Sequence, residues 1–436
     1  MRTRKHNLLS AWMLIAASCC MLNALTADTS GLFTYSDNGS SIAITGYPRC
    51  AVGTIEIPST INGKPVYDIC DNAFTNCAGL TNVRIPDSIT SIGSSAFCGC
   101  IGLTSVTIPG KIARIGSNAF AQCSGLTSIM IPASVISIGN GVFDSCTGLT
   151  TITVDALNAG YCSLDGVLFN KNQTTLIVCP GGKAGGLTIH SGVTSIGSGA
   201  FYRCTGLTSV TIPSSVTSIG STAFQNCSGL SHIIIPSSVI SIGDNAFKFS
   251  TGLTGIIIPA GVTSIGSYTF YCCTGLTGVS LPASVTSIGS HAFDSCTSLT
   301  AITVDLPNAK YSSVDGVLYD KKQTMLIQCP GGRAGTVTIP AGVRSIGDNA
   351  FDSCIGLTSV TIPATVTDIK SSAFDSCSGL TSITIPAEVT SIGRKAFFSC
   401  NGLTSVHFIG NAPVMGLGVF DATATGFTVY YPKIRS

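Results

Sequence analysis

The residues best suited to do chemistry are carboxylates in a recurring Phe-Asp-Ser-Cys segment. Asp352 and Asp375 follow phenylalanines 23 residues apart. If the two segments stack as neighbouring rungs, their carboxylates lie roughly 5 Å apart. Such a pair can act as acid and base or hold Ca²⁺. Asp144 and Asp294 occupy the same place, but the copy before each has no carboxylate there. Most copies therefore lack the pair, and we interpret these aspartates as solvated turn residues.

The chain contains 20 cysteines, a number that suggests disulfides or metal ligands. Free cysteine also behaves as a small hydrophobic residue, and we predict a ladder of buried thiols for those at one shared position. Cys50 with Cys70 is the best disulfide candidate, and Cys162 with Cys179 is a second one. No Cys-x-x-Cys pair with matching histidine spacing exists, so we predict no metal site and no cofactor. The ladder cysteines, each three residues after a phenylalanine, are Cys77, Cys100, Cys123, Cys146, Cys204, Cys227, Cys273, Cys296, Cys354, Cys377 and Cys400.

The five histidines share no position relative to the cysteines or carboxylates. They are His6, His190, His232, His291 and His407. A nucleophile, a base and an orienting group cannot be assembled from this pattern. We therefore predict no catalytic residue and a protein that is not an enzyme.

These residues are positioned by a repeat of 23 residues, represented by 103–124. In this copy Val106-Thr107-Ile108 alternates apolar and polar residues, which predicts a strand with one buried face. Pro109 ends the strand because it has no N–H for a ladder. Ile112 and Ile115 point inward from a second short extended piece, and residues 117–120 predict a single helical or 3₁₀ turn. A fixed period of this length predicts a solenoid, whose neighbouring units bury each other's apolar faces.

The pattern L-x-x-V-x-I-P-x-x-V-x-x-I-G-x-x-A-F-x-x-C resembles the BspA-like leucine-rich repeats of bacterial surface proteins, the 23-residue Treponema pallidum type. The resemblance covers nearly all of the chain after about residue 30. It implies a curved leucine-rich-repeat β-solenoid, here of about thirteen rungs, whose Leu-x-x-Val-x-Ile strands line the concave side. It also implies a secreted or cell-surface protein used for adhesion and protein–protein contact. It implies no catalytic residues.

The expected organisation has three parts. Residues 1–27 resemble a secretory signal peptide, with a membrane anchor as the alternative. Residues 28–72 form an N-terminal capping unit, and residues 73–436 form the solenoid, with a C-terminal cap at about 408–436. Related inserts at about 155–186 and 305–336 predict two rungs enlarged by a β-hairpin with a four-residue polar turn. The inserts lie 150 residues apart, which indicates a larger internal duplication.

Charged residues make up only 10% of the chain, which is too few for a surface that binds nucleic acid or anionic lipid. We expect no transmembrane helix in the mature chain and a monomer that binds a protein or cell-surface ligand. Most outward strand positions hold Ser or Thr. His232 with Ile234, then Gly255 with Ile257, depart from this pattern, and we predict that they bind a ligand. Drift of the repeat is the alternative explanation for this patch. Alternative functions are a solenoid enzyme acting on polysaccharide and an ice-binding Thr/Ser ladder.

Overall fold

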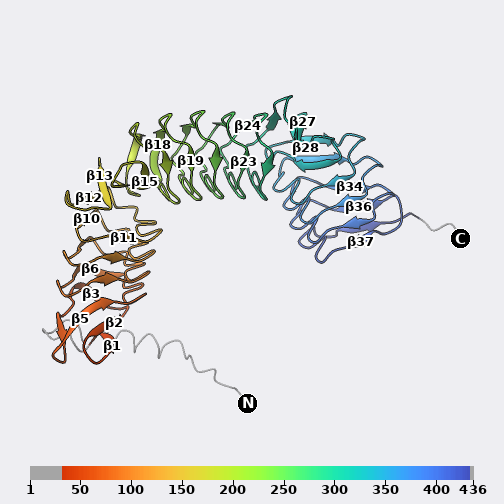
Figure 1. Ribbon diagram of the computed structural model, residues 1–436. Coiled ribbons are helices and arrows are strands. Elements are labelled where there is room, and N and C mark those ends of the chain that lie inside the picture. The colour runs from red at the N-terminus through yellow and green to blue at the C-terminus, as the bar shows by residue number, and fades with distance from the viewer. Residues whose placement is uncertain (1–31, 433–436) are drawn as a thin grey trace, which may run out of the picture. The chain divides into compact units, whose positions relative to one another are not determined.

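The computed structural model describes residues 32–432, so the expected signal peptide at residues 1–27 lies outside the described residues. The chain divides into two compact units. Within the described residues, unit 1 comprises residues 32–183 with 201–204, and unit 2 comprises residues 184–200 with 205–432. Residues 32–432 contain strands and turns but no α-helix. Each unit is a stack of rungs, and each regular rung gives one strand to each of two parallel ladders (Figure 1). The predicted solenoid of short strands is confirmed.

Unit 1 contains β1 to β15. The Leu-x-x-Val-x-Ile segments form its first ladder: β3 (Val52–Glu56), β6 (Gly79–Arg84), β8 (Ser105–Thr107), β10 (Ser128–Ile131) and β12 (Thr151–Val154). The second ladder contains β1 (Thr34–Asp37), β2 (Ile42–Gly46), β4 (Thr60–Ile61), β5 (Lys64–Ile69), β7 (Ser91–Ile92), β9 (Arg114–Ile115) and β11 (Ser137–Ile138). The insert supplies β13 (Tyr161–Leu164), β14 (Val167–Asn170) and β15 (Thr175–Val178).

Unit 2 repeats this plan. Its first ladder is β16 (Ala184–Thr188), β18 (Gly206–Thr211), β20 (His232–Ile234), β22 (Ile256–Ile257), β24 (Gly278–Leu281), β26 (Ala301–Val304), β30 (Gly335–Thr338), β32 (Leu357–Thr361), β34 (Ser382–Ile385), β36 (Ser405–Phe408) and β38 (Thr428–Tyr430). Its second ladder is β17 (Ser195–Ile196), β19 (Ser218–Ile219), β21 (Ser241–Ile242), β23 (Ser264–Ile265), β25 (Ser287–Ile288), β31 (Ser345–Ile346), β33 (Asp368–Ile369), β35 (Ser391–Ile392) and β37 (Val414–Met415). The second insert supplies β27 (Tyr311–Val314), β28 (Val317–Asp320) and β29 (Met325–Gln328).

The first-ladder strands bury alternate side chains, as their sequence predicts. In β8 Val106 is buried, whereas Ser105 and Thr107 are exposed. Neighbouring rungs keep the same register, with Val106 beside Val83. Each apolar side chain therefore packs on its counterpart in the next rung, and full burial of each contributes roughly 1.5–3 kcal/mol.

The Phe-containing turn is held by hydrogen bonds between residues three apart. The Ala119 N–H donates to Gly116 O at 3.3 Å, and the Cys123 N–H donates to Phe120 O at 3.2 Å. The positive φ of 56° at Asn118 interrupts helical geometry, so the predicted single helical turn does not extend into a helix. The Phe120 ring stacks on Phe97 with centroids 5.3 Å apart and planes 3° apart. The aromatic ladder is therefore continuous with the aliphatic core.

The cysteine ladder has a hydrogen-bonding role besides filling space. The Cys123 thiol donates to Phe97 O at 3.1 Å, one rung away, and the Cys146 thiol donates to Phe120 O at 3.0 Å. In the rung with serine at this position, the Ser250 hydroxyl donates to Phe224 O at 2.6 Å. Each small side chain therefore gives a second donor to a buried carbonyl that also accepts the N–H three residues later in its own rung. The predicted ladder of small buried groups is confirmed.

Aromatic side chains cover Phe74, the first ring of the stacked phenylalanine ladder in unit 1, and Phe420, the last ring of the ladder in unit 2. The Phe33 and Tyr47 rings lie 6.3 and 5.5 Å from the Phe74 ring. In unit 2, Phe427 packs against Phe420 with ring centroids 5.0 Å apart. These contacts shield the terminal rings from water, as the end units of a solenoid must.

Each insert contains two tight turns where one was predicted. The expected four-residue turn joins β14 to β15 and β28 to β29. The sequence reasoning missed the Asp165-Gly166 turn between β13 and β14, where φ is 50° and 76°. Asp-Gly is the dipeptide that favours two-residue hairpins with positive φ. Each insert is therefore a three-stranded antiparallel meander.

A buried asparagine fixes the start of each insert. The Asn308 side chain is fully buried and makes four hydrogen bonds. It donates to Pro282 O and Val285 O at 2.9 Å each, and it accepts from the N–H groups of Lys310 and Tyr311 at 2.8 Å each. Asn158 makes the equivalent four bonds in unit 1. We call the four bonds of Asn308 the asparagine clamp. It places Tyr311 at the edge of β25, where the Tyr311 hydroxyl accepts the Ile288 N–H at 3.1 Å.

Candidate functional site

The predicted ligand-binding residues lie on the outward side of the first ladder in unit 2. Ile234 and Ile257 are 79% and 78% exposed, an unusual state for isoleucine. Ile234 lies beside Thr211 in β18, and Ile257 lies beside Ser280 in β24. The two isoleucines therefore form an apolar pair between hydroxyl-bearing residues. We call His232, Ile234, Gly255 and Ile257 the outward patch.

The other two members of the patch shape its edge. His232 is exposed, and its Nδ1 lies 2.9 Å from the Ser231 hydroxyl. At Gly255 an added Cβ would meet no atom within 4 Å, so the backbone there is open. The sequence reasoning missed Met130, which is 56% exposed at an outward position of β10 in unit 1. Its signal was an apolar residue at a position that usually holds Ser or Thr.

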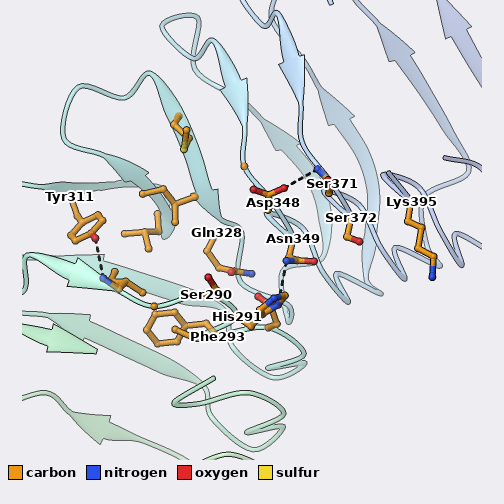
Figure 2. Close-up of a pocket in the computed structure, with 18 of the residues that line it drawn as sticks. Ser290, His291, Phe293, Tyr311, Gln328, Asp348, Asn349, Ser371, Ser372 and Lys395 are labelled. Atoms are coloured by element: carbon orange, nitrogen blue, oxygen red, sulfur yellow. Dashed lines mark hydrogen bonds and ion pairs between the residues drawn. The ribbon is translucent and has the colours of Figure 1, made fainter. Parts of the chain in front are cut away.

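A pocket opens beside the second insert, entirely within unit 2, with a volume of about 920 Å³. Figure 2 shows Tyr311 on one side, Lys395 on the other, and His291, Gln328 and Asn349 between them. The pocket lies between the edge of β25 and the strands of the insert and continues along the turns that follow β31, β33 and β35. The sequence reasoning did not predict this pocket.

Two side chains 58 residues apart meet in the pocket around a buried carboxylate. His291 Nδ1 lies 2.6 Å from Asp294 Oδ2, and the Asn349 amide nitrogen lies 3.2 Å from the same ring nitrogen. Asp294 is only 2% exposed, so the prediction that it is a solvated turn residue is wrong. Its other oxygen accepts no hydrogen bond within residues 32–432. Burial, reinforced by the Asp352 carboxylate, raises the pKa of Asp294 above its ordinary value against the opposing effect of His291.

The predicted carboxylate pair is held by serines. Asp352 Oδ2 accepts from the Ser295 N–H at 2.9 Å and from its hydroxyl at 3.0 Å. Asp375 Oδ1 accepts from the Ser376 hydroxyl at 2.8 Å. Burial raises the pKa of both carboxylates, and both are half-buried rather than fully solvated. Each carboxylate thus has its own hydrogen-bond donors beside it.

Aromatic side chains flank His291 on the side of the preceding rung. The Tyr268 ring stacks on the imidazole at 4.6 Å with planes 13° apart. Lys248 Nζ lies 4.8, 5.2 and 5.4 Å from the ring centres of Tyr268, Tyr271 and Phe249. Tyr268, Phe249 and His291 all have positive φ, which large side chains rarely adopt. This edge of unit 2 therefore carries a rigid aromatic cluster with its own cation.

The two candidate disulfides, one in the N-terminal cap and one in the first insert, are not formed. Cys70 and Cys162, one member of each candidate disulfide, carry free thiols. Cys162 instead donates to Asn170 O at 3.2 Å across its hairpin. Within residues 32–432, no group of three His, Cys, Asp or Glu side chains is arranged to hold a metal ion. That part of the chain also has no helix with the length and apolar character to cross a bilayer.

Several solved bacterial structures are similar to this chain. A leucine-rich repeat protein from Bacteroides ovatus is 22% identical over 94% of this chain and 100% of its own, with a TM-score of 0.43. A leucine-rich cell surface protein from Faecalibacterium prausnitzii is 28% identical over 95% of this chain and 97% of its own, with a TM-score of 0.41. The Treponema pallidum leucine-rich repeat protein is 24% identical over 63% of this chain and 91% of its own, with a TM-score of 0.32.

No curated protein matches the chain significantly. Six copies of the BspA type leucine-rich repeat region match residues 40–173, 183–308 and 333–434. These ranges include nearly all strands of both ladders in each unit, and β13 with β14 of the first insert. Because they cover well over half of the sequence, the protein belongs to the BspA-type leucine-rich repeat family.

Proposed function

We propose that this protein is a secreted or cell-surface scaffold that binds another protein through the outward patch, without catalysis. The observation that carries the proposal is the pair of exposed isoleucines on neighbouring strands β20 and β22. Neighbouring exposed apolar side chains rimmed by polar residues mark contact surfaces in soluble proteins. The family supports a protein-binding role, and the F. prausnitzii relative is described as a cell surface protein.

The patch has the chemistry of a small protein interface. Two isoleucines supply apolar area, and His232 with the surrounding hydroxyls supplies a polar rim. Full burial of each isoleucine contributes about 1.5–3 kcal/mol, so the pair changes affinity by roughly a hundredfold or more. The open backbone at Gly255 allows a partner side chain to approach closely.

The test is binding to a panel of purified extracellular-matrix proteins, measured by biolayer interferometry. Ile234→Asp with Ile257→Asp is expected to abolish binding of any matrix protein that the wild type captures. The matched control is Ile240→Asp, which makes the same change at a 58% exposed isoleucine between the two ladders. It is expected to bind like the wild type.

A second control addresses the turn edge. Asp352→Ala with Asp375→Ala removes the carboxylates and leaves the outward patch intact. If binding survives the isoleucine changes but is lost with these aspartates, the outward patch is the wrong surface. Turnover of a polysaccharide that depends on these aspartates would favour the enzyme alternative over a binding scaffold.

A further inference from the structure

The pocket in unit 2 exists because the second insert interrupts the second ladder. β25 is the last strand of its sheet, and β27 begins the next sheet. The Tyr311 hydroxyl, bonded to the Ile288 N–H, occupies the edge where a further strand would pair. The remaining space of about 920 Å³ falls in the range of small-molecule sites, roughly 300–1,000 Å³.

One wall of this pocket is apolar. It is lined by Ile288 from β25, Tyr311 from β27, Leu318 from β28, and Met325 with Ile327 from β29. Leu318 is fully buried, while Met325 is 40% exposed at the mouth. The last four side chains come from β27, β28 and β29, which are hydrogen-bonded to one another, so this part of the wall is formed before any ligand arrives.

The opposite end of the pocket is cationic. Arg394 and Lys395 line it, and neither forms an ion pair with any residue from 32 to 432. The exposed carboxylate in the lining, Asp348, accepts the Ser371 N–H at 3.0 Å. The other carboxylate, Asp294, is buried against His291. Arg394 is exposed, and Lys395 is half-buried with its Nζ 4.4 Å from the Phe398 ring centre. Apart from the His291 and Asp294 pair, the lining therefore carries two positive charges against one negative charge, an excess that suits a single anion.

The internal duplication supplies a comparison at the level of sequence. Residues 150 positions earlier preserve much of the apolar wall, with Tyr161 for Tyr311 and Ile177 for Ile327. The polar end differs. The counterparts of Arg394, Lys395, His291, Asn349 and Met325 are Asp244, Asn245, Gly141, Gly199 and Thr175. The repeat therefore tolerates either group of residues at this end of the pocket. The cationic residues are specific to the second copy, and the fold does not require them.

We propose that this pocket binds a small amphipathic carboxylate, whose apolar body lies on Tyr311, Met325 and Ile327 and whose carboxylate meets Arg394 and Lys395. The guanidinium can hold a carboxylate through two parallel hydrogen bonds, and the lysine adds a second positive charge. β29 and β35 are three strand steps apart, or roughly 14 Å. The ligand is therefore extended, as an acyl chain or a short acylated peptide is. This site is separate from the outward patch.

The test is isothermal titration calorimetry of the protein with decanoate. We expect saturable binding at one site. Arg394→Asp with Lys395→Asn, which installs the residues of the first copy, is expected to weaken binding at least tenfold while leaving the thermal melt unchanged. Met325→Thr, again the residue of the first copy, is expected to weaken binding about threefold through the apolar wall. N-acetyl-trileucine is titrated in parallel, and the tighter of the two ligands identifies an acyl or a peptide source.

A charge-matched control separates the pocket from general electrostatics. Lys321→Asp with Lys322→Asn removes the same net charge from the exposed turn of the same insert and is expected to bind decanoate like the wild type. Decyltrimethylammonium, with the same chain and the opposite charge, is expected not to bind. The proposal is overturned if neither carboxylate binds, if the cation binds equally well, or if both double variants weaken binding alike. Ile234→Asp with Ile257→Asp is expected to leave decanoate binding unchanged, because neither residue lines the pocket, so failure of the outward patch would not be confused with failure here.

Discussion

Removal of the Asn308 side chain tests how the second insert is fixed to unit 2. Asn308→Ala deletes four hydrogen bonds of 2.8–2.9 Å at a fully buried position. At about 1 kcal/mol of net stabilisation per bond, the loss is about 4 kcal/mol. The substitution also removes a partner from four backbone groups, the carbonyls of Pro282 and Val285 and the N–H groups of Lys310 and Tyr311. Because buried polar groups that lose a partner are themselves destabilising, the loss of stability should not be smaller than this value.

The assay is hydrogen–deuterium exchange read by mass spectrometry of peptides. A loss of 4 kcal/mol raises exchange of the Lys310, Tyr311 and Ile288 amides by up to roughly a thousandfold where exchange follows local opening of the insert. Peptides of unit 1 should be unaffected, and Asn158→Ala should produce the mirror result there. Asn401→Ala, at an exposed turn, is the control and should change little. The clamp model fails if exchange in residues 282–311 is the same in Asn308→Ala and Asn401→Ala.

Three further predictions concern unit 1. Phe120→Ala opens a cavity in the ring ladder and should cost about 3–5 kcal/mol, seen as faster hydrogen exchange in residues 97–143. Cys123 should react with iodoacetamide only after unfolding, because it is fully buried and burial raises its pKa far above the ordinary value. Half-buried Cys98 should react earlier, in the native protein. Mass spectrometry measures the labelling of both. Burial raises the pKa of Asp144 to about 6, so the folded state favours its protonated form and unit 1 should lose stability as pH rises from about 4 through 6. The loss of unfolding free energy is at most about 3 kcal/mol, and about 1–2 kcal/mol once screening by water around this part-buried carboxyl is allowed for. Asp144→Asn should abolish this pH dependence in thermal melts recorded at several pH values.

Each of these predictions has an outcome that contradicts it. Unchanged exchange around Phe120→Ala would mean that the rings do not support one another. Labelling of Cys123 as fast as Cys98 in native protein, or sulfurs already oxidised, would rule out a reduced buried ladder. A pH slope that persists in Asp144→Asn, or that disappears equally in the exposed control Asp87→Asn, would assign the effect to other groups.

The sequence by itself determined the rung, because every interaction within a rung repeats at 23 residues. The alternation Val106-Thr107-Ile108 set which strand face is buried, and the shared cysteine position predicted a small buried group. The outward exposure of Ile234 and Ile257 followed from the same period. These properties depend on spacing within the repeat and on similar neighbouring copies, so the repeated sequence is enough to infer them.

Only the tertiary structure decided what happens where the period breaks. The second insert loops out, so His291 meets Asn349 from 58 residues away, and Ser295 meets Asp352 from 57 residues away. These contacts bury Asp294, which the repeat pattern alone assigned to solvent. The spacing His291-x-x-Asp294 was visible in the sequence, but its partners and the pocket were not. A contact between residues of different rungs depends on how far the chain departs before it returns, and the packing of the insert sets that distance.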